Sequence, residues 1–403
     1  MVWLKVNIMK INVCLSFGTT LCKMITGLLF LAILSHAITN AEYSIIVTSL
    51  FFAQLLSVFV DGGINNEVLS LTKETLDNDT DEYQKLSMNG AVRLVVHLFF
   101  SFILSIYFIL VDGWNAGWIF FLGYISGVLS SILETYSIKL KTEYKYIEDF
   151  VLNLFCSMFI LLSSFFVYMF PQFLVLYLVF FRLIPLAIYR KPLHVFKMIK
   201  MIDYKMIKNN YIERKHYSID SIATSINLQL DSFFLLLLFG REIYAYYQPL
   251  NRLYNSCIGL SSAVVSFAIP YAHLLTSKVK KVCFLVFSFS LSAIIISLLY
   301  CSFSRDVVMT FFGDKFSMDE KYIILFSVLI FVRYLCASFG SYLMISGEQK
   351  KRALINLTIT ILCIPLISIS ETYSDILMVI IGGQVFISCL YLLVFKKGAG
   401  YDK

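Results

Sequence analysis

Long apolar runs alternate with short polar connections along the whole chain. These runs are long enough to cross the hydrocarbon core of a bilayer as helices, and short connections are typical of antiparallel helical neighbours. The expected segments cover residues 11–35, 43–72, 87–111, 115–138, 149–169, 172–189, 216–238, 244–276, 282–303, 322–346, 353–370 and 375–395. The pattern therefore predicts an all-α integral membrane protein with about 12 transmembrane helices.

A basic connection from Arg190 to Lys215 divides these segments into two sets of six. We expect two six-helix bundles, formed by residues 1–200 and 201–403. The sequences Glu42-Tyr43 and Glu242-Ile243-Tyr244 each open the second helix of their half, about 200 residues apart. Two halves with the same orientation predict a pseudo-twofold axis along the membrane normal, around a central cavity.

Composition supports a membrane protein and excludes several classes of site. The chain is 59% hydrophobic, and only 15% of its residues are charged, against roughly 25% in soluble domains. The nine cysteines are scattered without a C-x-x-C pair, so neither a zinc site nor a disulfide framework is indicated. We expect no metal and no cofactor.

The distribution of positive charge predicts the orientation of the helices. With both termini placed in the cytoplasm, most of the 33 Lys and Arg residues fall in cytoplasmic connections, as the positive-inside rule requires. The outer loops hold only Arg241, Arg305, Lys315 and Lys321. Five more lie within expected helices: Lys23, Arg93, Arg182, Arg252 and Arg333. The net charge of +7 is thus explained without a nucleic-acid partner.

Several expected helices carry polar residues three or four positions apart, which places them on one helix face. Asn227 and Asp231 share such a face in segment 216–238, and Arg252 and Asn255 share one in segment 244–276. Lys23 belongs to a similar stripe in segment 11–35. For the Ser, Thr and Gly members of these stripes, helix packing is the favoured interpretation. A mid-helix charge costs about 2.5–3.5 kcal/mol to insert, which favours a functional site for the charged members.

Three further expectations concern polar residues within the helices. Asp231 and Arg252 lie at matched depths on neighbouring helices, so we expect an ion pair, acting either as a transport switch or as a permanent brace. Arg333 is near the middle of its helix and is a further candidate for the cavity. His97 stands alone on an apolar face, which favours a packing role with satisfied hydrogen bonds.

The stretch from Ala41 to Lys73 also resembles a known family. Its Glu42-Tyr43-Ser44, long apolar run and Leu55-Leu56-Ser57 followed by Asp61 and Gly63 resemble the second helix of bacterial polysaccharide flippases. These are the O-antigen (Wzx-type) flippases of the multidrug/oligosaccharidyl-lipid/polysaccharide exporter superfamily. The resemblance continues through Asp231, the Phe239-Gly240 turn and the late Pro270, although Glu242-Ile243 stands where that family usually has glycine.

The resemblance implies a MATE-like fold, alternating access and an undecaprenyl-diphosphate-linked oligosaccharide as cargo. An O-antigen or capsule repeat unit would move from the inner to the outer leaflet of the bacterial inner membrane. Partners would be the bilayer, a polysaccharide polymerase and a chain-length regulator. The expected substrate-binding residues are Lys23, Arg252, Asp231, Asn227, Asn255 and Arg333, and the expected gating or structural residues are Asp61, Gly62 and Gly63.

Two other functions remain open from the sequence. One is a cation-coupled multidrug exporter of the same superfamily, although a cavity that is basic at depth disfavours cationic drugs. The other is a membrane polysaccharide polymerase, which typically has a long arginine-containing outer loop. The chain contains no H-E-x-x-H motif and no nucleophile elbow, so we do not expect an enzyme.

Overall fold

The computed structural model describes residues 2–61, 80–142, 145–188, 215–275, 277–313 and 319–399, and single positions at 203, 205, 208, 212 and 316. Over these ranges the chain is helical and contains no strand. Nine of the described helices are long and apolar enough to cross a membrane. The predicted all-α, multi-pass membrane fold is confirmed.

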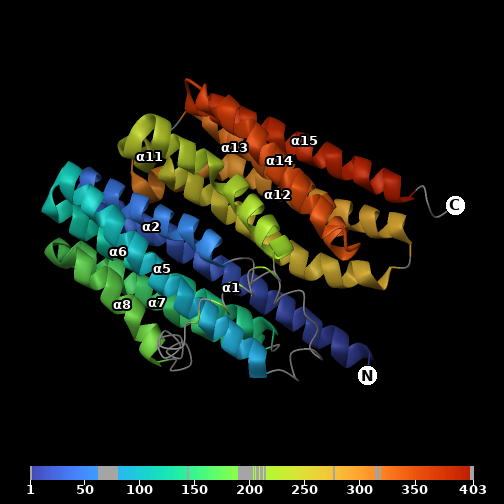
Figure 1. The fold of residues 1–403 in the computed structure, drawn as a ribbon, viewed down its shortest axis with the longest axis horizontal. Helices are drawn as coiled ribbons and strands as arrows, with labels where there is room; N and C mark the ends of the chain where they lie inside the picture. The colour runs from blue at the N-terminus through green and yellow to red at the C-terminus, as the bar shows by residue number, and fades with distance from the viewer. Residues whose placement is uncertain are drawn as a thin grey trace. The chain divides into compact units, whose positions relative to one another are not determined.

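Over the described residues, the helices follow the predicted segments closely. The first half contains α1 (Val2–Ala37), α2 (Asn40–Asp61), α5 (Thr80–Asp112), α6 (Trp114–Thr142), α7 (Tyr146–Met169), a short 3-10 turn η1 (Pro171–Phe173) and α8 (Leu174–Ile188). The second half contains α11 (Lys215–Leu274), α12 (Lys278–Phe312), α13 (Glu320–Ile345), α14 (Gln349–Ser368) and α15 (Tyr373–Ala399), as Figure 1 shows.

The chain divides into two compact units. One consists of Ile25–Ser225, and the other combines Met1–Met24 with Ile226–Lys403. The boundaries therefore fall inside α1 and α11, whereas the sequence pattern places the division at the basic connection near residue 200. We refer to these parts as the N-terminal unit and the C-terminal unit.

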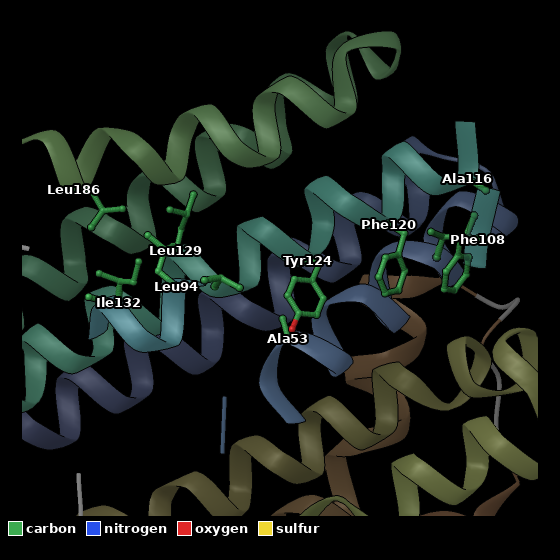
Figure 2. Close-up of a cluster of buried hydrophobic side chains, with 12 residues drawn as sticks. Ala53, Leu94, Phe108, Ala116, Phe120, Tyr124, Leu129, Ile132 and Leu186 are labelled. Atoms are coloured by element: carbon green, nitrogen blue, oxygen red, sulfur yellow. The ribbon is translucent and has the colours of Figure 1, made fainter. Parts of the chain in front are cut away.

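In the N-terminal unit, α6 packs against α2, α5, α7 and α8. The core includes Phe108, Phe120, Tyr124, Ile132 and Leu186, drawn with their neighbours in Figure 2. The rings of Phe108 and Phe120 stack with centroids 4.3 Å apart.

Two glycines allow α6 to approach α2 closely. A Cβ atom at Gly123 would lie 2.2 Å from the hydroxyl oxygen of Ser49, and one at Gly127 would lie 2.6 Å from the Cβ of Ala53. Both distances are shorter than van der Waals contact. Small residues at helix contacts are the usual solution in membranes, where packing replaces the hydrophobic effect between helices.

In the C-terminal unit, α13 packs against α12, α14 and α15. Buried tyrosines link its helices through backbone carbonyls: the Tyr300 hydroxyl donates to Leu250 over 3.1 Å, and the Tyr334 hydroxyl donates to Cys257 over 2.7 Å.

Helix α11 consists of two arms joined at Gly240. This residue has φ +83° and ψ 171°, a conformation essentially confined to glycine, and it interrupts the helical backbone. Asn251 on the second arm donates a hydrogen bond of 2.5 Å to the Ser232 hydroxyl on the first. The arms therefore fold back on each other, as the predicted turn at Phe239-Gly240 implies.

Local signals define several helix ends. Thr39 and Glu42 form a reciprocal capping box at the start of α2, in which each backbone N–H is bonded by the other residue's side chain. Thr372 and Asp375 repeat this arrangement at the start of α15.

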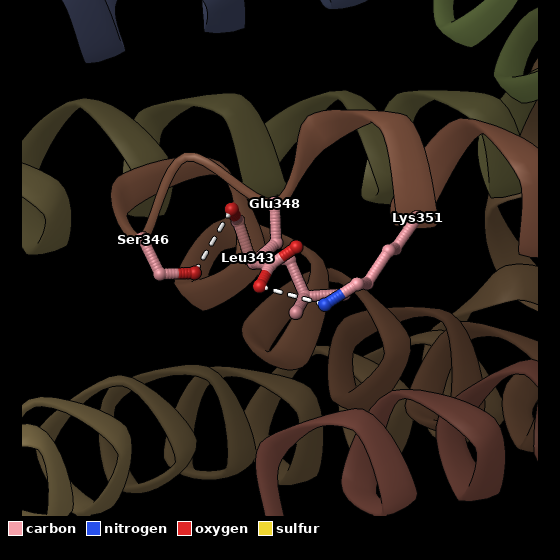
Figure 3. Close-up of polar contacts among 4 residues, drawn as sticks. All are labelled: Leu343, Ser346, Glu348 and Lys351. Atoms are coloured by element: carbon pink, nitrogen blue, oxygen red, sulfur yellow. Dashed lines mark hydrogen bonds and ion pairs between the residues drawn. The ribbon is translucent and has the colours of Figure 1, made fainter. Parts of the chain in front are cut away.

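The connection between α13 and α14 is a tight turn (Figure 3). Gly347 has φ +75°, the Ser346 hydroxyl donates to the Leu343 carbonyl over 3.1 Å, and Lys351 pairs with Glu348 at 2.8 Å. This turn holds α13 and α14 as antiparallel neighbours.

Candidate functional site

A network of buried polar side chains joins four helices of the C-terminal unit. The Asn227 side chain on α11 donates to the Thr360 hydroxyl on α14 over 3.3 Å and accepts a hydrogen bond from Gln384 on α15. Arg333 on α13 donates to the Asn227 carbonyl over 3.0 Å. These four side chains are all less than 10% exposed. They form a buried cluster that links the four helices.

Arg333 is further fixed by neighbouring groups. It also donates to the Leu228 carbonyl over 3.5 Å, and its guanidinium carbon lies 5.3 Å from the centroid of the Tyr254 ring. A cation over an aromatic face is stabilised by the ring quadrupole. The side chain is 5% exposed, so it is available to neighbouring protein groups but not to a ligand in an open cavity.

Asp231 lies one helical turn after Asn227 and is 1% exposed. Among the described residues, neither of its carboxylate oxygens makes a close hydrogen bond, although the Tyr373 hydroxyl is near enough to interact with them. It is close enough to Arg333 for direct electrostatic interaction, and Tyr254 and Tyr373 also lie within electrostatic reach. A buried carboxylate is costly, and the nearby guanidinium reduces that cost.

The predicted pair between Asp231 and Arg252 is wrong. The cation that acts on Asp231 is Arg333, and Arg252 is only partly buried. The prediction compared depth along two helices but ignored rotation about their axes. Facing arms of a hairpin meet along one narrow strip, which here contains Ser232 and Asn251.

Three of the predicted site residues belong to a more open group. Lys23 on α1 and Asn255 on α11 are exposed, and Arg252 is intermediate. Asn255 donates to the Asn251 side chain over 3.1 Å, which connects it to Ser232 beside Asp231. The structure therefore separates the predicted residues into a buried set, Asn227, Asp231 and Arg333, and an open set, Lys23, Arg252 and Asn255.

The predicted gating residues lie at the limit of the described structure. Asp61 is the last residue of α2, and its side chain is not described. Gly62 and Gly63 lie outside the described residues.

Sequence reasoning missed Thr360 and Gln384, which complete the buried network. Gln384 follows Gly382 and Gly383 within an apolar segment, and an uncharged amide at that depth was the available signal. Thr360 gave no such signal, because hydroxyl residues also pack helices in membranes.

The N-terminal unit has a separate polar centre around His97, which is fully buried on α5. Its Nε2 atom lies 3.1 Å from the Ser57 hydroxyl on α2, and its Nδ1 atom lies 2.8 Å from the Tyr124 hydroxyl on α6. The predicted packing histidine with satisfied hydrogen bonds is confirmed, although its neighbours are not purely apolar.

Another buried cation of this unit is Arg182 on α8. It donates to the Ser126 carbonyl over 3.1 Å and to the Ser130 hydroxyl, and it lies 5.5 Å from the centroid of the Phe30 ring. The contacts of Arg182 are those of a brace between helices.

Over the described residues, no group of three or more His, Cys, Asp or Glu side chains is placed to hold a metal ion. The polar centres instead combine amides, hydroxyls and guanidinium groups. Such groups bind anions and sugar hydroxyls when they are accessible, and they brace helices when they are not.

No protein-family model matches the chain, and no curated protein matches its sequence. Solved structures do match it. The MATE multidrug transporter DinF-BH, solved in complex with a ligand, superposes with a TM-score of 0.65 at 13% identity, over 97% of this chain and 95% of that one. The chain has the fold of a MATE transporter.

Two other MATE-type structures agree over similar lengths. A mutant of the MATE transporter VcmN from Vibrio cholerae gives a TM-score of 0.63 at 12% identity, covering 98% of this chain and 97% of that chain. A MOP superfamily transporter from Pyrococcus furiosus, whose reversed binding-pocket polarity suggests a different function, gives 0.60 at 10% identity, covering 97% and 95%. The MATE fold thus accounts for nearly the whole chain.

Proposed function

We propose that this chain is a transporter that moves an anionic, lipid-linked oligosaccharide from the inner to the outer leaflet of a bacterial inner membrane. The cargo would be an undecaprenyl-diphosphate-linked repeat unit, and the mechanism would be alternating access. The observation that carries the proposal is the exposure of Lys23 on an apolar helix of a MATE fold.

Lys23 lies well inside the apolar span Cys14–Ala37. It is nine residues past Cys14, or roughly 13 Å along the helix axis at 1.5 Å per residue. A lysine exposed to lipid at that depth costs about 2.5–3.5 kcal/mol even on the lenient insertion scale. A water-filled space beside α1 removes that cost, and a transport cavity supplies such a space.

The open set has the chemistry that an oligosaccharide diphosphate needs. Lys23 and Arg252 offer positive charge, and the arginine fork can bind a phosphate through two parallel hydrogen bonds. The Asn255 amide can donate to and accept from sugar hydroxyls. Helix α1 contains no acidic residue, which disfavours a cationic cargo at this face.

Lys23, Arg252 and Asn255 belong to the C-terminal unit, together with the buried network. We assign the binding of cargo to this open set. Asn227, Asp231 and Arg333 then support it by fixing α11 against α13, α14 and α15. A polysaccharide polymerase and a chain-length regulator would receive the delivered repeat units, and both termini of the transporter would be cytoplasmic.

A second candidate is export of cationic drugs, which the names of similar solved structures favour. DinF-BH is a multidrug transporter, and another match is an inward-facing multidrug resistance MATE transporter at 11% identity and a TM-score of 0.63. The two candidates predict opposite responses to loss of positive charge in the open set.

The experiment compares Lys23→Ala, Arg252→Ala and Arg252→Lys with Arg305→Ala as a matched control in the native host. Arg305 is more than half exposed and pairs only with exposed Glu320 in the described structure. We expect loss of surface polysaccharide in both open-set alanine variants, with normal membrane accumulation, and no change in the control. Arg252→Lys should fail as well if bidentate binding is required.

Normal polysaccharide in both open-set alanine variants would exclude a mechanism in which Lys23 and Arg252 bind an anionic cargo. Efflux of a cationic rhodamine dye should be measured in the same strains. Efflux that persists or increases when Lys23 is removed, together with unchanged polysaccharide, would establish the drug exporter instead.

A further inference from the structure

Gln248, on the second arm of α11, is a buried amide whose donor group is unused. Its side chain is 7% exposed, and among the described residues its Nε2 atom has no hydrogen-bond partner. Five other amide side chains of the described structure are also less than 10% exposed, and each makes a hydrogen bond: Asn153, Asn227, Asn251, Asn356 and Gln384. A buried N–H group without a partner is costly, so this amide indicates a partner from outside the described chain.

Gln248 shares a helix face with two residues of the open set. Spacings of four and three residues place Gln248, Arg252 and Asn255 on one side of α11. Exposure increases along this side, because Gln248 is buried, Arg252 is partly buried and Asn255 is exposed. A Cβ atom at Gly259, one turn further on, would have no neighbour within 4 Å. The face therefore opens from Gln248 towards Gly259, and Gln248 lies at its closed end.

The position of Gln248 along α11 fits a cargo that enters with its sugars first. Gln248 precedes Arg252 by four residues, or roughly 6 Å along the helix axis. The turn at Gly240 is expected at the outer side of the membrane, so the face opens towards the cytoplasmic side. A head group that enters from that side and places its diphosphate at Arg252 would extend its first sugars towards Gln248.

The chemistry of the amide suits the uncharged part of such a cargo. A neutral amide adds no charge that would favour the diphosphate. A sugar hydroxyl both donates and accepts hydrogen bonds, so it satisfies the amide in either orientation of its nitrogen and oxygen atoms. A buried polar group also discriminates strongly against an analogue without the matching hydroxyl, because the group is then left unpaired.

We propose that Gln248 is a sugar-binding residue, which recognises a hydroxyl group on a sugar close to the diphosphate of the cargo. This inference rests on the proposed function, since it adds a sugar subsite to the open set. Lys23 and Arg252 hold the charged diphosphate, and Gln248 distinguishes a lipid that carries the glycan from one that does not.

Binding measurements on the full chain in lipid nanodiscs test the proposal with two probes. One is the lipid-linked repeat unit extracted from host cells that lack the transporter, and the other is undecaprenyl diphosphate without sugar. The test variant is Gln248→Met, which keeps a long unbranched side chain and removes the amide. Gln172→Met makes the same change at an exposed position in η1, and Arg252→Ala reports binding of the diphosphate.

We expect Gln248→Met to raise the Kd for the glycan-bearing probe roughly tenfold and to leave the Kd for undecaprenyl diphosphate unchanged. Arg252→Ala should weaken binding of both probes, and Gln172→Met should affect neither. The unfolding temperature of Gln248→Met should not fall, because Nε2 has no hydrogen bond to lose in the described structure. A residue that only packs helices would instead lose stability without any selectivity between the probes.

Unchanged affinity of Gln248→Met for the glycan-bearing probe, or an equal loss for both probes, would overturn the assignment of Gln248 and leave the proposed function intact. A marked fall in its unfolding temperature would also overturn the assignment, because it would show that the protein itself uses the amide. Wild-type protein that binds neither probe would overturn the proposed function, and the assignment of Gln248 with it.

Discussion

The guanidinium of Arg333 donates a hydrogen bond of 3.0 Å to the backbone carbonyl of Asn227. This bond holds the positive charge one helical turn from Asp231, whose carboxylate makes no close hydrogen bond in the described structure. Arg333 therefore braces α13 against α11, and the same side chain interacts electrostatically with the buried Asp231.

Replacing Asp231 by Asn should destabilise the protein by up to about 3–5 kcal/mol, because it removes the carboxyl group that interacts with the buried Arg333 guanidinium. The measurement is thermal unfolding of detergent-solubilised protein, followed by loss of the monodisperse peak. Arg252→Ala should change stability little, since Arg252 is only partly buried.

A double-mutant cycle tests the coupling of these two charges. The Asp231→Asn/Arg333→Met variant removes both and should recover much of the stability lost in either single variant. Additive losses in the double variant would show that the charges are not coupled. Unchanged stability in Asp231→Asn alone would mean that the carboxyl is already uncharged.

The close contact of α2 and α6 should not tolerate a side chain at Gly127. Gly127→Val places methyl groups where Ala53 already lies and should cost about 1–3 kcal/mol. Gly382→Val on α15 is the matched control, because no atom lies within 4 Å of the position that its Cβ would take. Equal unfolding temperatures for the two variants would contradict the packing described for α6.

The turn in α11 depends on backbone conformation and not on space. The Cβ added in Gly240→Ala would have no atom within 4 Å. The backbone φ of +83° should nevertheless lower the stability of this variant by about 1–3 kcal/mol. Gly382→Ala, in a helical backbone, should instead stabilise the protein by up to about 1 kcal/mol. If Gly240→Ala is as stable as the wild type, the arms of α11 can be joined without this conformation.

The orientation of the helices predicts where reporter fusions will be active. Phosphatase fusions at Lys145, Lys205 and Lys280 should be inactive, because these connections are expected in the cytoplasm, while fusions at Arg241 should be active. Periplasmic activity at any of the three lysines would overturn the predicted topology, and the cytoplasmic placement of both termini with it.

The helices were predictable because hydrophobic length and polar connections determine them locally. Gly240 and the sequence around it indicated the turn in α11, and the structure places the break there. Glu42 was noticed as part of an internal repeat and of a family-like pattern, although the Thr39-to-Glu42 spacing is itself a capping-box signal.

The arrangement of the site was less predictable. Helical spacing correctly grouped Asn227 with Asp231, because both lie on the same buried face of α11. It did not identify Arg333 as the partner of Asp231, since that contact depends on how α13 is rotated against α11. Nor did it reveal that Ser57 bonds to His97, which needs the register of α2 against α5.

The buried network also has a consequence for biosynthesis. Asn227 is bonded by Arg333 and Gln384, which follow it by 106 and 157 residues. At translation rates of roughly 5–20 residues per second, Asp231 and Asn227 leave the ribosome many seconds before these partners exist. Ser232 and Asn251, only 19 residues apart, can pair within the nascent hairpin. Until α13 and α15 have been made, the polar side chains on the first arm of α11 therefore lack these partners.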